Sequence, residues 1–185
     1  GSEMCIRDSG RTRPAALFLS HQDGWQMKIE TENLILRPIS YFDARDMFEY
    51  ASDPKLALYG SWAPHTRIEE TLSVIQNMIE KSDDRPLFAI VHKADKKMIG
   101  TIHANIDRTE DGAGQRSEVG YIISPAYQNR GYASESLVAF IKYLFDEYDI
   151  HRVEGRHLAD NIASGRVMDK AGMEVEGCLL YTSDA

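Results

Sequence analysis

The stretch that decides the fold reads Gly120-Tyr121-Ile122-Ile123-Ser124-Pro125-Ala126-Tyr127-Gln128-Asn129-Arg130-Gly131-Tyr132-Ala133. Its apolar start is typical of a strand, its middle of a loop and its end of a helix N-terminus. Such a loop aims successive backbone N–H groups into one hollow, and the following helix adds its positive end. The stretch therefore predicts a pyrophosphate site, with Gly131 allowing either close approach or a positive φ. Taken alone, Gln-x-x-Gly-x-Ala fits an ordinary helix start equally well.

Hydrophobic periodicity around this stretch predicts one α/β layered domain with a central sheet. Asp53-Pro54 is expected to end the first helix, and residues 59–65 to form a loop rich in aromatic side chains. There is no P-loop sequence and no three-glycine dinucleotide fingerprint. We expect strands over 34–37, 87–92, 97–106, 117–123, 152–157 and from 173 onward, and helices over 40–52, 66–81, 134–146 and 161–170.

Composition narrows the class of protein. The chain has 185 residues, of which 43% are hydrophobic and 27% charged, as in ordinary globular domains. No apolar run approaches the ~20 residues of a membrane-spanning helix, so we expect no membrane partner. The net charge of −8 argues against a nucleic-acid partner, which would require a basic surface.

Both ends of the chain have an unusual coding property. Met4–Ser9 can be encoded by ATG-TGT-ATA-AGA-GAC-AG and one further base, and residues 178–183 by the reverse complement of that string with a short offset. This favours translated sequencing adapter at residues 1–9 and 178–185, the alternative being a purification scar and coincidence. Met27 then reads as the native start, and 10–26 as translated upstream DNA or a flexible extension. The expected domains are 1–26, 27–177 and 178–185.

The two cysteines, Cys5 and Cys178, both fall in these suspected ends. They allow either one disulfide between the ends or two free thiols. If both are foreign, the natural segment has no cysteine, and cysteine usage does not indicate a redox compartment.

Three motifs carry a resemblance to a known family. Thr31-Glu32-Asn33-Leu34-Ile35-Leu36-Arg37 fits Thr-x-x-Leu-x-Leu-Arg, Trp62–His65 fits Trp-x-Pro-His, and 121–133 fits Tyr-x-Ile-x-Pro-x-x-Gln-x-x-Gly-Tyr-Ala. Together with Asn161 and the segment 168–173, they resemble the GCN5-related N-acetyltransferase (GNAT) superfamily over about residues 29–177. The branch that the chain resembles contains the ribosomal-protein alanine and serine N-acetyltransferases.

The resemblance implies a GNAT-type α/β fold with a mixed, mostly antiparallel central sheet flanked by about four helices. Its C-terminal strand or strands would be truncated here, which would leave a sheet edge and an apolar face uncovered and the chain weakly active at best. The strands 117–123 and 152–157 would separate to admit the pantetheine arm of acetyl-CoA, the co-substrate. The residues implied in cofactor binding are Ile122, Ile123, Gln128, Asn129, Arg130, Gly131, Tyr132, Ala133 and Asn161.

The same resemblance implies direct transfer of the acetyl group to an amine. Glu118 is the candidate general base, with a surface carboxylate as the alternative reading. Many family members place a tyrosine where this chain has Met168, so Ser164, or a water that it holds, is the candidate proton donor. Tyr59 and Trp62 are the candidate acceptor-binding residues, and aromatic packing between the helices and the sheet is the alternative for Trp62.

The expected acceptor is a protein N-terminus of ribosomal type or a small amine. We expect a cytoplasmic monomer or homodimer that uses acetyl-CoA and no metal, because the histidines lack metal-ligand spacing. Two alternatives stay open. One is an acyl-CoA-binding module without catalysis, and the other is a nucleotide-binding α/β domain that prefers ATP or NAD to CoA.

Overall fold

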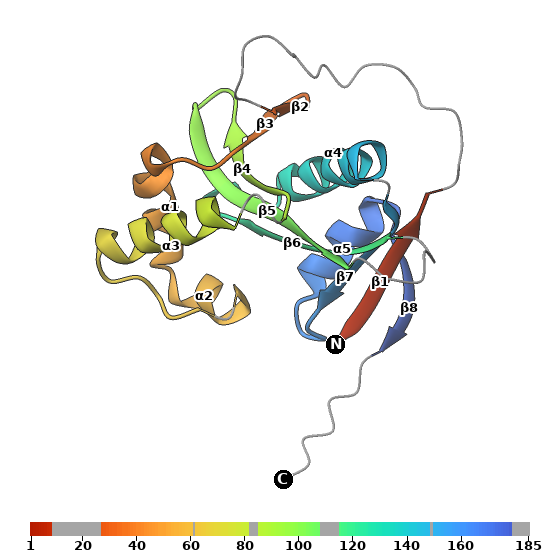
Figure 1. The fold of residues 1–185 in the computed structure, drawn as a ribbon. Coiled ribbons are helices and arrows are strands. Elements are labelled where there is room, and N and C mark those ends of the chain that lie inside the picture. Colours follow the sequence, from red (N-terminus) through yellow and green to blue (C-terminus); the bar gives the residue numbers. More distant parts are fainter. Residues whose placement is uncertain (9–26, 61, 82–84, 108–114, 149, 179–185) are drawn as a thin grey trace.

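The computed structural model describes residues 1–8, 27–60, 62–81, 85–107, 115–148 and 150–178. Its centre is one sheet of eight strands in the order β2-β3-β4-β5-β6-β7-β1-β8 (Figure 1). All neighbours are antiparallel except β6 and β7, so the expected mixed, mostly antiparallel sheet is confirmed. The strands are β1 (Ser2–Arg7), β2 (Ile29–Glu30), β3 (Leu34–Arg37), β4 (Leu87–His92), β5 (Lys97–Asp107), β6 (Gln115–Ile123), β7 (Ile150–His157) and β8 (Glu174–Cys178).

Five α-helices are present in the described part of the chain, where about four were expected. They divide between the two faces of the sheet, α1 to α3 on one face and α4 and α5 on the other (Figure 1). They are α1 (Ala44–Ala51), α2 (Pro54–Gly60), α3 (Ile68–Glu80), α4 (Tyr132–Glu147) and α5 (Ile162–Lys170), with short 3-10 turns at Tyr41–Asp43 and Pro125–Tyr127.

Each face of the sheet has its own apolar core. The face under α4 is packed with aromatic rings. Phe88 meets Phe140 and Tyr143 edge to face, with ring centres 5.9 and 5.4 Å apart. The face under α1 and α3 is built around Met47 and Ile75, which lie against β4 and β5. Because α4 is anchored along its length by this packing, its N-terminus is held at a fixed place beside the sheet.

The parallel pair β6 and β7 separates part-way along. Paired residues run from Gln115 with Ile150 to Val119 with Gly155, and no pair follows. On its other side β6 stays paired with β5 as far as Ile123, opposite Gly100. Over residues 120–123, β6 therefore has a strand partner on one side only. This is the separation of strands that the sequence analysis expected.

Strand β1 has no counterpart in the sequence analysis, which placed residues 1–9 outside the domain. Ser2–Arg7 lies between β7 and β8, antiparallel to both, and buries Met4 and Cys5. The outer edge of β7 is therefore paired. Cys5 is a free thiol, so of the two readings of the cysteines the disulfide is excluded.

Candidate active site

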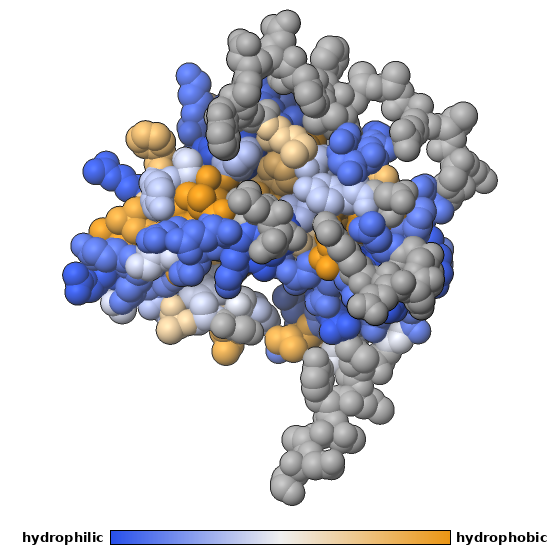
Figure 2. All heavy atoms as spheres, viewed as in Figure 1, coloured by the Kyte–Doolittle hydropathy of each residue, from blue (hydrophilic) through white to orange (hydrophobic). Residues whose placement is uncertain are grey.

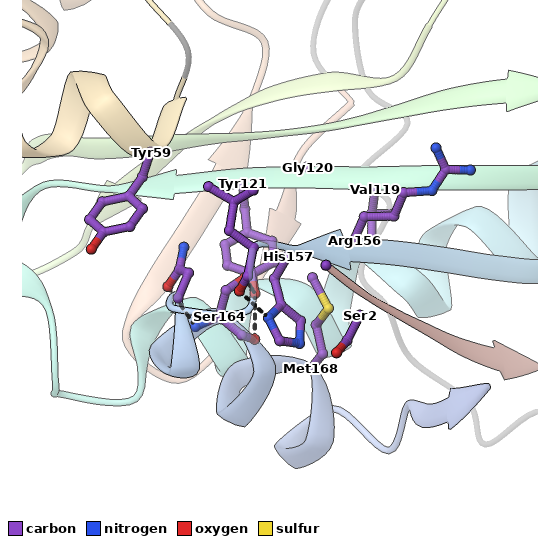
Figure 3. Close-up of a pocket in the computed structure, with 12 residues that line it drawn as sticks. Ser2, Tyr59, Val119, Gly120, Tyr121, Arg156, His157, Ser164 and Met168 are labelled. Atoms are coloured by element: carbon purple, nitrogen blue, oxygen red, sulfur yellow. Dashed lines mark hydrogen bonds between the residues drawn. The ribbon is translucent and has the colours of Figure 1, made fainter. Parts of the chain in front are cut away.

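A pocket of about 230 Å³ opens where β6 and β7 separate. Figure 2 shows the surface hollowed between the regions of α2 and α5, at the lower edge of the view. In Figure 3, Tyr59 approaches from α2, Tyr121 from β6, and Ser164 and Met168 from α5. The lining residues are Gly1, Ser2, Tyr59, Val119, Gly120, Tyr121, Arg156, His157, Leu158, Asn161, Ser164 and Met168. Three of the residues expected from the sequence, Tyr59, Asn161 and Ser164, are thus brought together.

Ser164 is paired with a tyrosine that the sequence analysis did not single out. The Tyr121 hydroxyl lies 3.0 Å from Ser164 Oγ and donates to the Ser164 carbonyl at 3.1 Å (Figure 3). Burial raises the pKa of Tyr121 to about 12, although its bond to Ser164 acts in the opposite direction. Tyr121 is therefore protonated at neutral pH, and a hydroxyl pair that can pass a proton lines the pocket.

The start of α5 is fixed by Asn161, whose side chain accepts a hydrogen bond from the Ser164 N–H at 3.1 Å. This is an N-cap, and it holds Ser164 at the pocket. One turn further on, Met168 is 2% exposed and packs against Gly155, where an added Cβ would lie 2.9 Å from the Met168 sulfur. Met168 thus fills its place with an apolar thioether and offers no proton.

Glu118 lies on β6 opposite Asn105 of β5, on the face of the sheet that carries α1 to α3. Its carboxylate is partly exposed and lies 3.6 Å from the guanidinium of Arg156, a pocket residue. Glu118 does not itself line the pocket, and Arg156 connects it to the pocket wall.

On the same face, His103 of β5 lies opposite Gly120. Its ring occupies the space beside this glycine, because an added Cβ at Gly120 would lie 2.6 Å from the ring carbon Cε1. Burial lowers the pKa of His103 to about 4, and the charge of Arg85 acts in the same direction. The imidazole is therefore neutral at neutral pH.

The backbone of β6 is oriented by Gly100. An added Cβ at Gly100 would overlap the carbonyl oxygen of Ile122. The carbonyl carbon of Ile122 would be further from that Cβ, at 3.0 Å. The Ile122 carbonyl therefore points toward β5. In a planar trans peptide the next N–H points the opposite way, so the Ile123 N–H faces the gap between β6 and β7.

The loop after β6 has the geometry of an anion-binding hollow. Asn129 and Gly131 both have positive φ, at 61° and 87°, and α4 begins at the next residue. Of the two reasons for Gly131 weighed from the sequence, the structure supports positive φ, because an added Cβ there would meet nothing within 4 Å. The Gln128 side chain donates to the Ile123 carbonyl at 3.0 Å and ties the loop to the end of β6.

The first turn of α4 is also tied to the β2–β3 turn. Glu135 accepts hydrogen bonds from the Thr31 hydroxyl at 2.6 Å and from the backbone N–H of Asn33 at 2.7 Å. Burial favours the neutral acid, but these bonds outweigh it and lower the pKa of Glu135. The threonine that opens the Thr-x-x-Leu-x-Leu-Arg motif therefore helps to hold the helix that follows the loop.

Trp62 does not line the pocket. Its indole N–H donates to the Ala51 carbonyl at 3.1 Å, and its ring fills the space beside Gly60, where an added Cβ would collide with it. The ring joins the end of α1 to the end of α2. It supports the helix that carries Tyr59.

Within the described residues, no three His, Cys, Asp or Glu side chains gather as a metal site would require. No helix in the same part of the chain is long and apolar enough to cross a membrane.

Comparison with known proteins identifies the family. The family model described as "Acetyltransferase (GNAT) domain" matches residues 33–174. "Uncharacterized N-acetyltransferase YnaD" of Bacillus subtilis is 32% identical over 151 residues, covering 82% of this chain and 85% of the relative. "[Ribosomal protein uS5]-alanine N-acetyltransferase" of Escherichia coli is 25% identical over 160 residues, covering 82% and 80%.

Solved structures agree with this fold. A GNAT-family acetyltransferase from Bacillus anthracis has a TM-score of 0.70 at 28% identity and covers 83% of this chain and 89% of its own. A ribosomal L7/L12 alpha-N-protein acetyltransferase, RimL, solved in complex with coenzyme A, also has a TM-score of 0.70, at 23% identity and 83% and 86% coverage. The chain therefore belongs to the acetyltransferase (GNAT) domain family, and it is an acetyl-CoA-dependent N-acetyltransferase with relatives among the ribosomal-protein acetyltransferases.

Proposed function

We propose that this chain moves an acetyl group from acetyl-CoA to a primary amine by direct attack of the amine within a ternary complex. The observation that carries the proposal is the pocket between the separated ends of β6 and β7, which is followed at once by the loop 128–133 and the N-terminus of α4. A CoA molecule fits this order, since its arm needs strand-like backbone partners and its pyrophosphate needs N–H groups.

In the proposed complex, the Ile123 N–H pairs with the pantetheine arm as a further strand would. The sequence also implied Ile122 in this pairing, but its carbonyl is turned toward β5 and away from the gap. The N–H of Ile123, which faces the gap, polarises the thioester carbonyl. One preorganised donor of this kind contributes about 3 kcal/mol to transition-state stabilisation in other enzymes. Asn161 contributes by holding the first turn of α5 against the arm.

The pyrophosphate binds to backbone N–H groups of the loop. Left-handed residues at Asn129 and Gly131 turn these groups toward one hollow, and the N-terminus of α4 adds its partial positive charge. Arg130, whose guanidinium lies 5.5 Å from the centre of the Tyr127 ring, brings a full charge to the same loop. The residues of this phosphate site are Gln128, Asn129, Arg130, Gly131, Tyr132 and Ala133.

For the chemical steps, Glu118 takes the proton of the attacking amine, directly or through water. Ser164 returns a proton to the leaving thiolate, and the Tyr121 hydroxyl, 3.0 Å from Ser164 Oγ, helps to hold that side chain at the pocket. The thiolate is a weak base, so this second step needs little assistance. Glu118 lies on one face of β6 and Tyr121 on the other, so the two proton transfers use separate routes.

Tyr59 and Trp62 form the acceptor side, Tyr59 by contact and Trp62 by supporting α2. We infer a protein N-terminus as the acceptor, because the uS5-alanine enzyme matches four-fifths of this chain; a small amine is the other outcome to test. The acidic balance of the chain suits a cationic acceptor of either kind. The reaction consumes acetyl-CoA, which favours the cytoplasm, and we infer a monomer or homodimer.

We also infer that residues 27–177 carry this acetyltransferase domain, with 1–26 and 178–185 of separate origin. The family match over 33–174 lies wholly inside those limits. The complete source gene tests this boundary: codons for Cys-Leu-Leu-Tyr-Thr-Ser at its native position would contradict it.

Thiol release from acetyl-CoA across a panel of alanine- and serine-starting peptides, polyamines and amino acids tests the function. We expect release with at least one amine, and a loss of about 10²-fold or more in kcat for Glu118→Gln. The matched control is Glu147→Gln, the same change on an exposed carboxylate at the far end of α4. Binding of CoA without any turnover would favour the non-catalytic module, and tighter binding of ATP or NAD would refute the assignment.

The pyrophosphate assignment has its own test. Gly131→Glu places a carboxylate in the hollow and should abolish CoA binding in a calorimetric titration, while the fold survives because the site is open. Gly131→Ala is the control, since the alanine must adopt the same unfavourable positive φ as the glutamate, at a cost of about 1 kcal/mol, but adds no charge. Equal CoA affinity in wild type and Gly131→Glu would remove the assignment.

A further inference from the structure

A chain of hydrogen bonds connects the phosphate loop to the turn between β4 and β5. The Tyr132 hydroxyl lies 2.9 Å from His92 Nε2, His92 Nδ1 lies 2.9 Å from Asp95 Oδ2, and the Tyr127 hydroxyl donates to the same Asp95 oxygen at 2.7 Å. Tyr127 and Tyr132 bracket the loop, one on each side of 128–131. His92 and Asp95 are therefore bonded to both of its ends.

The protons in this chain can be assigned from the chemistry of the groups. Hydrogen bonds from Tyr127 and His92 lower the pKa of Asp95, so its carboxylate is ionised and only accepts. His92 Nδ1 must then be the donor to Asp95. In the neutral ring Nε2 is the acceptor, and it accepts a hydrogen bond from the Tyr132 hydroxyl. Both tyrosine hydroxyls thus donate toward one His–Asp pair.

Ring packing adds to these bonds. The His92 ring centre lies 4.9 Å from that of Tyr132 and 5.4 Å from that of Tyr127, and the two tyrosine rings lie 6.4 Å apart. His92 is 8% exposed and sits at the end of β4, a strand buried along its whole length. The packed rings of His92, Tyr127 and Tyr132 therefore connect the loop to the rigid sheet.

We propose that His92 is a positioning residue for CoA, which fixes the phosphate loop through Tyr132 and, by way of Asp95, through Tyr127. Asn129, the left-handed residue of the loop that is not glycine, carries backbone strain, and a tether at each end of the loop keeps the N–H groups aimed at the pyrophosphate before it binds. The inference rests on the proposed function, because it assigns the loop to the pyrophosphate.

The first measurement is the dissociation constant for coenzyme A by calorimetry. Tyr132→Phe removes one hydrogen bond and keeps the ring, so we expect the constant to rise about threefold to tenfold. His92→Leu should exceed this, and His92→Gln, which keeps an amide at the position of Nε2, should recover part of the loss. Tyr148→Phe is the matched control, because it removes a hydroxyl at the other end of α4, 3.4 Å from that of Tyr143.

A double variant and a kinetic split separate positioning from general stability. If Tyr132 acts through His92, Tyr132→Phe added to His92→Leu should change CoA affinity less than twofold further. With an amine that the wild type acetylates, the KM for acetyl-CoA should rise in His92→Gln by a larger factor than kcat falls, while the KM for the amine stays within about twofold.

The outcomes are distinguishable. Wild-type CoA affinity in Tyr132→Phe and His92→Gln, or an equal loss in Tyr148→Phe, would overturn the positioning role and leave the proposed function standing. A wild-type chain that binds no CoA would overturn the proposed function and this inference with it.

Discussion

Replacing His103 should flatten the acid limb of the stability curve. Its pKa lies near 4 in the folded chain and near 6.5 in an exposed histidine, because burial opposes the charged ring. Below pH 6.5 the unfolded chain therefore takes up a proton that the folded chain accepts only near pH 4. The unfolded state binds more protons in this window, so stability falls as the pH falls.

The magnitude follows from the two pKa values. The proton uptake at His103 should leave the free energy of unfolding almost unchanged at pH 7.5, and lower it by about 1 kcal/mol at pH 5.5 and about 3 kcal/mol at pH 4.5. Urea unfolding at these three pH values measures it. Carboxylates that titrate in the same range contribute equally to wild type and variant, so the difference between the two curves isolates His103.

Two replacements without a titrating ring, His103→Gln and His103→Phe, make the comparison robust. Their packing costs differ and shift each curve by a constant, but both should remove about 3 kcal/mol of the drop between pH 7.5 and pH 4.5. Curves that run parallel to the wild type for both variants would refute a neutral, buried imidazole beside Gly120.

Three further substitutions test other parts of the structure, each by urea unfolding at pH 7. Gly100→Ala should cost about 1–3 kcal/mol, because its methyl group would overlap the Ile122 carbonyl, and it should also weaken CoA binding; wild-type values for both would contradict the close approach. Arg37→Met should cost about 3–5 kcal/mol, since it leaves the carboxylate of Asp43, 4% exposed, without the guanidinium bonded to it at 2.6 and 2.9 Å; a loss below 1 kcal/mol would contradict the pairing. Trp62→Phe should cost about 1 kcal/mol by removing the indole N–H bond to Ala51, with a larger loss for Trp62→Ala. If both variants had the same free energy of unfolding as the wild type, Trp62 would act by substrate contact alone.

The strands and helices that could be predicted from the sequence are those whose own pattern is strong. β4 was predicted with the bounds that it has, because a strand buried on both faces appears as an uninterrupted apolar run. The helix at 134–146 appears as α4 with slightly extended ends. Its apolar residues Leu137, Phe140, Ile141, Leu144 and Phe145, whose spacing indicates one buried face, all belong to the core or pack against it.

Helix α2 was missed because Pro54 was interpreted only as a stop signal. A proline also fits the first position of a helix, where its missing N–H costs nothing. Asp53 then caps the new helix, as its carboxylate accepts from the N–H of Lys55 at 2.8 Å and of Leu56 at 3.2 Å. The dipeptide ends α1 and starts α2, and this second role places Tyr59 at the pocket.

For the site, the sequence predicted features formed by neighbouring residues of the chain and missed contacts between residues that are far apart in it. The loop 128–133 follows β6 directly, so its place at a helix N-terminus could be inferred from local pattern. Tyr121 with Ser164, and His92 with Tyr132, are contacts across 43 and 40 residues. No local periodicity indicates them. Only the alternation of β6, which turns Tyr121 away from Glu118, offered a signal for the first pair.

The position between β7 and β8, which β1 occupies, places few requirements on the amino-acid sequence of the strand that fills it. Its register with β7 is continuous over six pairs, whereas its register with β8 is broken between Glu3 and Met4. Ladder hydrogen bonds are made by backbone groups that every residue except proline carries, so this place in the sheet requires mainly an extended segment with apolar side chains at two positions. Met4 and Cys5 meet that requirement. A strand here also supports β7 at the point where it leaves β6, and the pocket depends on that separation. If the proposed separate origin of this segment holds, a foreign strand completes the sheet and places Gly1 and Ser2 at the wall of the pocket.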